Sequence, residues 1–145
     1  MLIRTILKAK VIAGVATVAP DATLAEAARE LSSRNIGALV VTEAPDQPLG
    51  ILSERDIVRE LGRKGPGCMN QPVRAVMTRE LIVCSPNDLS DAVLGQMTAG
   101  HFRHMPVIEG ERMIGLISIG DVVKAQLGKL AMEKDALEGM IAGGY

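Results

Sequence analysis

The chain contains an internal repeat, which constrains the fold more than any other feature of the sequence. Residues 18–41 align without gaps with residues 84–107, at an offset of 66 positions. One residue is then lost in a turn, and residues 50–58 (GILSERDIV) align with residues 115–123 (GLISIGDVV). A period of this length predicts two supersecondary units that bury their apolar faces against each other.

The first copy predicts five elements in the order β-α-β-β-α. A short strand ends at Val18, two further strands cover residues 37–41 and 49–53, and a second helix begins at Glu54. The first helix presents one apolar face, with i, i+3, i+4, i+7 spacing, formed by Leu24, Ala27, Ala28 and Leu31.

The second copy predicts the same order of elements. Its first strand ends at Val83, its two paired strands cover residues 104–108 and 114–118, and its last helix begins at Ile119. The equivalent apolar helix face is formed by Ser90, Val93, Leu94 and Met97. Because neither copy can cover both faces of its small sheet, we predict an α/β fold of the α+β type, with the two copies related by a pseudo-twofold axis.

These patterns predict one module over residues 1–145. The first copy spans residues 5–61 and the second spans residues 72–126. A linker rich in glycine and charge joins them at residues 62–71, and residues 127–145 form a C-terminal helix and tail.

Composition argues against several classes of partner. Aromatic residues make up 1% of the chain, which leaves almost no platform for stacked bases, and 16 basic against 17 acidic residues give a net charge of -1. We therefore expect no nucleic-acid partner. Cys68 and Cys84 match neither a disulfide framework nor a zinc motif. The uncharged stretch at residues 11–20 is shorter than the about 20 apolar residues of a membrane span, so we expect a cytoplasmic protein without a membrane partner.

The sequence resembles the CBS-domain pair, and four segments in order carry the resemblance. They are residues 50–58, 73–78 (VRAVMT), 102–107 (FRHMPV) and 115–123, within a likeness that covers residues 5–124. The chain is most similar to small stand-alone bacterial members. The resemblance implies a regulatory energy or redox sensor that binds AMP, ATP, NAD(H) or S-adenosylmethionine between its repeats. It also implies a flat homodimer and a downstream protein of unknown identity.

The two copies differ at positions that bear on ligand binding. Val40 stands where the family often has proline, as Pro106 does in the second copy. Gly-Ala at residues 37–38 stands where the second copy has Arg-His at residues 103–104. We therefore expect the two clefts between the repeats to be non-equivalent.

A Ser-x-x-Asp motif occurs at both strand-to-helix junctions, from Ser53 to Asp56 and from Ser118 to Asp121. One interpretation is a capping box, with serine at the N-cap and the acid three residues later. The other is that each aspartate accepts hydrogen bonds from ribose hydroxyls while the serine and the helix N-terminus hold phosphate. The motif alone favours the cap and the resemblance favours the ligand; the two roles are compatible.

Three side chains near strand ends are candidates for holding phosphates. Arg55 lies in the first repeated signature, where the second has Gly120, and Arg103 and His104 precede the inner strand of the second copy. A guanidinium can hold a phosphate through two parallel hydrogen bonds, although a solvated surface arginine is the commoner case. Our hypothesis is that these three side chains converge on the phosphates.

The residues around the base are predicted on weaker grounds. Small side chains at residues 36–38 would let the backbone approach a flat base, although a tight helix-to-strand turn also needs glycine. These candidates are Ile36, Gly37 and Ala38, and the further candidates for the adenine wall are Thr17, Val18, Val83 and Phe102.

We expect no catalysis, no metal site and no enzyme cofactor. His101 and His104 are the two histidines of the chain, and neither an acidic ligand at metal spacing nor a nucleophile motif accompanies them. Two alternatives remain open. In one, the protein is a structural adaptor whose Ser-x-x-Asp motifs are only caps; in the other, it is an enzyme that acts on nucleotides through Asp56 and Asp121.

The C-terminal segment has a helical pattern with a 3-4-3-4 spacing, formed by Leu127, Leu130, Lys134, Leu137 and Ile141. This pattern, interrupted by one charge, fits either a helix packed on its own subunit or a short contact between subunits. The contact between subunits is the interpretation that we favour.

Overall fold

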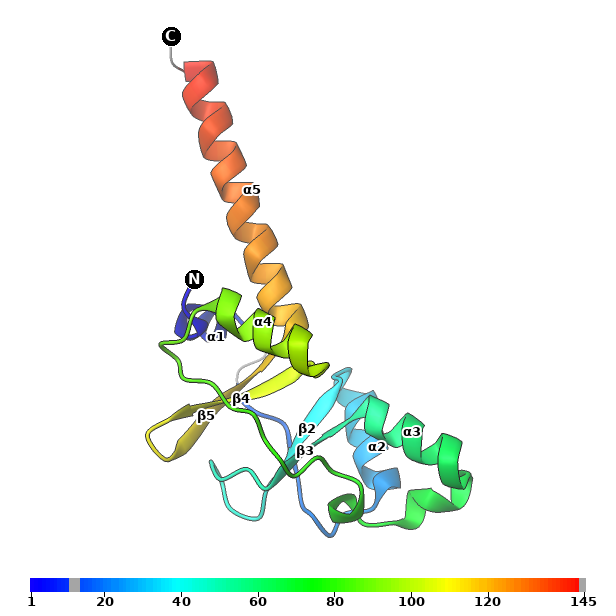
Figure 1. The fold of residues 1–145 in the computed structure, drawn as a ribbon. Coiled ribbons are helices and arrows are strands. Elements are labelled where there is room, and N and C mark those ends of the chain that lie inside the picture. The colour runs from blue at the N-terminus through cyan, green and yellow to red at the C-terminus, as the bar shows by residue number, and fades with distance from the viewer. Residues whose placement is uncertain (11–13, 144–145) are drawn as a thin grey trace.

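The first repeat forms the five predicted elements in the computed structural model, which describes residues 1–10 and 14–143 (Figure 1). Its three-stranded sheet has the order β1-β2-β3, in which β1 is parallel and β3 antiparallel to the central strand β2. The predicted apolar helix is confirmed, with Leu24, Ala27 and Leu31 buried. The elements are β1 (Thr17–Val18), α2 (Leu24–Arg34), β2 (Ala38–Val41), β3 (Gly50–Ser53) and α3 (Glu54–Lys64).

The second repeat differs from the prediction at its first strand. Cys84 forms a single parallel bridge with Val107, and no strand ends at Val83. In the first repeat the Val40 amide donates to the Ala16 carbonyl, but the equivalent position is Pro106, which has no N–H. The lost hydrogen bond explains the shortened strand. The remaining elements are α4 (Ser90–Gly100), β4 (His104–Glu109), β5 (Arg112–Ser118) and α5 (Ile119–Gly143), with β4 antiparallel to β5.

The predicted linker at residues 62–71 is more ordered than its composition indicates. The helix α3 continues to Lys64, and a 3₁₀ helix, η1 (Pro66–Asn70), follows. This short helix buries Cys68 in the core of the first repeat. The segment is therefore part of the first repeat's packing.

The segment at the start of each repeat, before its first strand, packs on the other repeat. The N-terminal helix α1 (Ile3–Ala9) buries Ile3 and Ile6 in the core of the second repeat, together with Met97, Met105 and Ile117. Conversely, the 3₁₀ helix η2 (Val73–Ala75) buries Val73 in the core of the first repeat. This reciprocal exchange ties the two halves together.

The first glycine of each repeated signature lies where the exchanged segment crosses the sheet. A Cβ atom on Gly50 would lie 2.7 Å from the Thr78 carbonyl oxygen. A Cβ atom on Gly115 would lie 2.8 Å from a methyl group of Leu7. The chain leading into the second repeat thus passes directly over Gly50, and the Leu7 side chain lies directly over Gly115.

The C-terminal helix α5 is one continuous element, so no separate helix begins at residue 127. Its first turns contact the second repeat through the buried Val122, and Gln126 donates hydrogen bonds to Ser90 and Asp91. The rest of the helix extends away from both repeats (Figure 1). Residues 144–145 of the predicted tail lie outside the described residues. Among the described helices, none is long and apolar enough to span a membrane.

Candidate functional site

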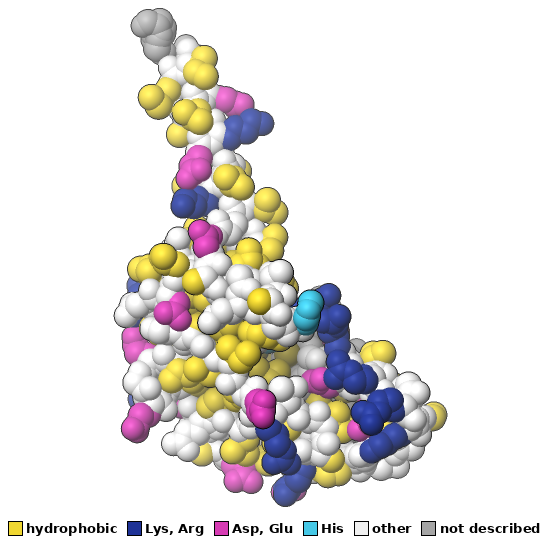
Figure 2. Space-filling view, in the orientation of Figure 1, with side chains coloured by type: hydrophobic (Ala, Val, Ile, Leu, Met, Phe, Trp, Pro, Cys, Tyr) yellow, Lys and Arg dark blue, Asp and Glu magenta, His cyan; other side chains and the backbone are white. Residues whose placement is uncertain are grey.

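A pocket of about 350 Å³ lies between the two repeats. One wall comes from β3 and the start of α3, another from the turn before β4, and the third from the chain that connects the repeats. Figure 2 shows a band of Lys and Arg side chains down one side of the molecule, next to a hollow. The lining residues are 37, 51, 53–56, 59, 78, 80–82 and 100–104.

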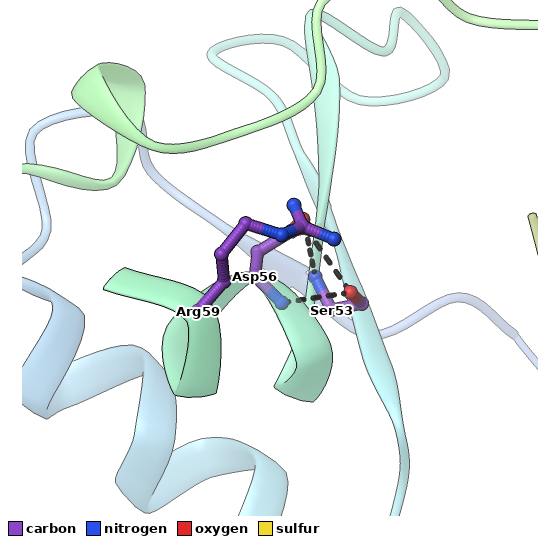
Figure 3. Close-up of polar contacts among 3 residues, drawn as sticks. All are labelled: Ser53, Asp56 and Arg59. Carbon is purple, nitrogen blue, oxygen red and sulfur yellow. Dashed lines mark hydrogen bonds and ion pairs between the residues drawn. The ribbon is translucent and has the colours of Figure 1, made fainter. Parts of the chain in front are cut away.

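The carboxylate of Asp56 is held at the edge of this pocket by the cap of α3 (Figure 3). The Ser53 amide donates to Asp56 Oδ2 over 2.9 Å, and the Asp56 amide donates to Ser53 Oγ over 3.3 Å. Asp56 Oδ1 accepts a hydrogen bond from Arg59 over 3.3 Å. The predicted capping box is therefore confirmed, and it fixes the orientation of the carboxylate.

The three predicted phosphate ligands, Arg55, Arg103 and His104, all line this one pocket. Arg55 and Arg103 form no ion pair with any residue in the described ranges 1–10 and 14–143. Their guanidinium groups are thus available to an anionic ligand. Arg59 also lines the pocket, although the sequence interpretation omitted it. Its position one helical turn after Arg55 is the signal that could have identified it.

His104 has a pKa below its ordinary value. Burial is the main cause, and the positive charges of Lys10 and Arg103 lower it further, against the raising effect of Asp121 and Glu54. At neutral pH the imidazole is therefore uncharged. It can contact a phosphate as a neutral hydrogen-bond donor, whereas the arginines supply the positive charge.

The second Ser-x-x-Asp motif lies outside the pocket. The Ser118 amide donates to Asp121 Oδ2 over 2.9 Å, and the Asp121 amide donates to Ser118 Oγ over 3.0 Å, so this motif also caps its helix. Lys10 Nζ lies 3.0 Å from Asp121 Oδ2 and donates to the Leu116 carbonyl over 2.8 Å. The acid of the second motif is thus already paired with a lysine, which the sequence interpretation missed.

Several of the predicted base-binding residues do not line the pocket. Gly37 and Phe102 do, but the other five do not: Thr17, Val18, Ile36, Ala38 and Val83. Successive residues of an extended chain point to opposite sides, so Gly37 faces the pocket while Ala38 is buried in the protein. Similarly, Ile82 lines the pocket and the adjacent Val83 does not.

The connecting chain contributes a wall whose position could not be predicted from the sequence. Thr78 and residues 80–82 line the pocket, including the apolar side chains of Leu81 and Ile82. Phe102 adds to this apolar surface and lies next to Arg103, in the turn before β4. In the described part of the chain, no group of three His, Cys, Asp or Glu side chains is placed to hold a metal ion.

Comparison with known proteins identifies the repeats. The sequence profile of the CBS domain matches residues 5–63 and 73–128. A mitochondrial CBS domain-containing protein of Arabidopsis thaliana, CBSX3, is 36% identical over 129 residues. That alignment covers 86% of this chain and 63% of the plant protein, so the chain spans less than two thirds of that relative's length.

Solved structures share the fold. A CBS-domain containing protein from Agrobacterium tumefaciens is 42% identical and superimposes with a TM-score of 0.83, covering 87% of this chain and 99% of that one. A second CBS domain pair, solved in complex with 5′-methylthioadenosine and S-adenosyl-L-methionine, is 23% identical. Its TM-score is 0.77, and the match covers 89% of this chain and 98% of that chain.

Proposed function

The chain belongs to the CBS-domain family as a tandem CBS pair, and from that premise we propose that it is a regulatory module whose pocket between the repeats binds an adenine nucleotide. The observation that carries the proposal is the meeting of Arg55, Arg103 and the capped Asp56 in one pocket that also has an apolar surface. A volume of about 350 Å³ lies within the range typical of small-molecule sites.

The groups around the pocket suit the three parts of a nucleotide. Arg55 and Arg103, with Arg59 beside them, supply bidentate donors for phosphates. The Asp56 carboxylate has lone pairs left for ribose hydroxyls after accepting from its own cap. Ile82 and Phe102 give the base an apolar wall. The relative solved with adenosyl compounds supports this ligand class, which includes AMP, ATP, NAD(H) and S-adenosylmethionine.

The position of the pocket supports a regulatory mechanism. Its walls come from both repeats, so a bound nucleotide contacts the N-terminus of α3 and the start of β4 together. Such a ligand favours conformations in which these walls are close, and thereby shifts the arrangement of the repeats or of a dimer that a downstream protein recognises. We propose a binding role without turnover: the Ser53 hydroxyl, which donates to Asp56 over 3.1 Å, is engaged in the cap of α3, where its oxygen also accepts from the Asp56 amide.

Isothermal titration of the purified protein with AMP, ADP, ATP, NAD, NADH and S-adenosylmethionine tests the proposal. We expect one or more of these ligands to bind, and the Arg103→Ala variant to bind at least about tenfold more weakly, because a charge-assisted phosphate contact is lost. Arg63→Ala is the matched control, since Arg63 is exposed on α3 and does not line the pocket. Absence of binding would favour the structural adaptor. Conversion of ATP or NADH on long incubation would favour the nucleotide-processing enzyme.

A further inference from the structure

The distal part of α5 packs against no other element among residues 1–10 and 14–143. Every residue from 127 to 141 is exposed, and the last hydrogen bonds that tie the helix to the second repeat are those of Gln126. An isolated helix of this length is marginal in water, and this one also contains Gly128 and Gly139. The segment therefore needs a packing partner to be a stable helix.

One face of this helix carries an apolar seam with heptad spacing. Leu127, Leu130 and Leu137 are each 59–61% exposed, and Ile141 is 81% exposed. The seam alternates steps of four and three residues, which is the pattern of a coiled-coil interface. Its six positions are Val123, Leu127, Leu130, Lys134, Leu137 and Ile141.

The seam is symmetric about Met132. Val123 and Ile141 lie nine positions on either side of it, Leu127 and Leu137 lie five, and Leu130 and Lys134 lie two. A second copy of the helix running in the opposite direction therefore faces every seam position with another seam position. A helix with this symmetry is complementary to itself across a twofold axis.

The charges beside the seam favour the antiparallel arrangement. In that arrangement Lys124 lies on the same flank as the partner's Glu138, and the two opposite charges attract each other. Because the pair is related by a twofold axis, this ion pair occurs twice. Each Lys134 packs its methylene stem against the partner's Leu130 and directs its ammonium group outward. On the other flank Glu133 approaches the partner's Glu133, next to the two Lys134 ammonium groups.

A parallel pair would bring like charges together. Lys134 would face the partner's Lys134 within the seam, and Glu133 would face the partner's Glu138 beside it. In the single helix Lys134 lies 3.9 Å from Glu138 of its own chain, and a parallel pair would place a second lysine beside it within the seam. The charge pattern thus selects one direction of pairing.

From the exposure, the symmetry and the charges, we propose that α5 pairs with α5 of a second copy of this chain as an antiparallel two-stranded coil centred on Met132. The contact spans about 27 Å of helix, and the two pairs of repeats lie at its opposite ends. The inference is independent of nucleotide binding, because no residue of the seam lines the pocket.

Disulfide trapping tests the direction of pairing. The native Cys68 and Cys84 are buried, so the added thiols of the L127C and L137C variants are the reactive ones. Under mild oxidation, we expect a mixture of the L127C and L137C proteins to form a disulfide-linked heterodimer. Neither variant alone is expected to form a linked dimer. A linked dimer of L127C alone would show parallel pairing and overturn the proposal.

Sedimentation equilibrium tests the contact itself. We expect the unmodified chain to dimerise reversibly and the L127E variant to dimerise at least about tenfold more weakly, because a charge replaces a leucine in two of the six layers. The control is M132E, which changes an equally exposed apolar residue on the opposite face. A monomer at all concentrations, or a dimer that L127E does not weaken, would overturn the proposal.

Discussion

Lys10 Nζ lies 3.0 Å from Asp121 Oδ2. Lys10 lies before the first strand of the first repeat and Asp121 lies in the last helix of the second, so the two residues are far apart in the sequence but adjacent in the fold. The contact makes the two Ser-x-x-Asp motifs different in kind. Asp56 borders an open pocket, whereas Asp121 already has a cationic partner from the segment that precedes the first repeat. The structure thus gives a physical basis for the expected non-equivalence of the two clefts.

Removing the Lys10 ammonium group is expected to free Asp121. The Lys10→Met variant keeps an apolar side chain of similar length, and we expect a second nucleotide to bind per chain. Both side chains are about one-quarter exposed, so losing the ion pair should lower the free energy of unfolding by about 1 kcal/mol. Isothermal titration gives the stoichiometry and urea unfolding the stability. An unchanged stoichiometry would show that Lys10 does not block a site.

The two aspartates form a matched pair of variants. Asp56→Ala and Asp121→Ala each remove the acidic half of a capping box and an ion pair, with Arg59 and Lys10 respectively, and should each lower stability by about 1–2 kcal/mol. Only Asp56 lines the pocket, so we expect nucleotide affinity to fall in Asp56→Ala alone. Titration of both proteins with the same nucleotide measures the difference. Equal affinities in the two variants would mean that both motifs are only caps.

Acidification should destabilise the fold through His104. Its pKa in the folded protein lies below the ordinary value of 6.5, mainly because of burial, so just below pH 6.5 the unfolded chain binds more protons. Stability is complete above this pH and falls as the pH drops from 6.5 toward the folded pKa, by at most about 1.4 kcal/mol per pH unit for one group. We expect His104→Asn to flatten this part of the profile. Urea unfolding between pH 7.5 and 5 on both proteins provides the comparison.

The two signature glycines should differ in their tolerance of a methyl group. In Gly50→Ala the new Cβ would meet a backbone carbonyl, which cannot move away, and the expected loss is about 2–3 kcal/mol. In Gly115→Ala it would meet the end of the flexible Leu7 side chain, and the expected loss is about 1 kcal/mol. Thermal and urea unfolding rank the two variants. The reverse order would show that the exchanged segments do not lie as described.

The elements of the fold were predictable because the signal for each is local. The period of Leu24, Ala27 and Leu31 predicts α2, and the two Ser-x-x-Asp motifs predict the starts of α3 and α5. The shortened strand before β4 could also have been predicted, since Pro106 cannot donate the hydrogen bond that Val40 donates in the first repeat.

The contacts between distant segments were not predictable in the same way. Nothing near Lys10 indicates that it meets Asp121, and nothing in the apolar pattern of α1 says which repeat it covers. The pocket wall at residues 80–82 likewise depends on the path of an irregular chain without periodicity. Arg55, Arg103 and His104 could be expected to lie near one another because each lies at the end of a predicted element, and they line one pocket; their contact with phosphates stays a prediction.

The reciprocal exchange of α1 and η2 has a consequence for how this protein folds and can be divided. A fragment holding the first repeat with α1 would expose Ile3 and Ile6 while lacking Val73, which fills its own core. The complementary fragment would lack Ile3 and Ile6, which complete the core of the second repeat. It would also carry Val73, which belongs to the core of the first repeat. Neither half is an autonomous folding unit, so the pair should unfold in a single cooperative transition. A single cut in the chain between the two halves should destabilise the protein less than separating the halves does.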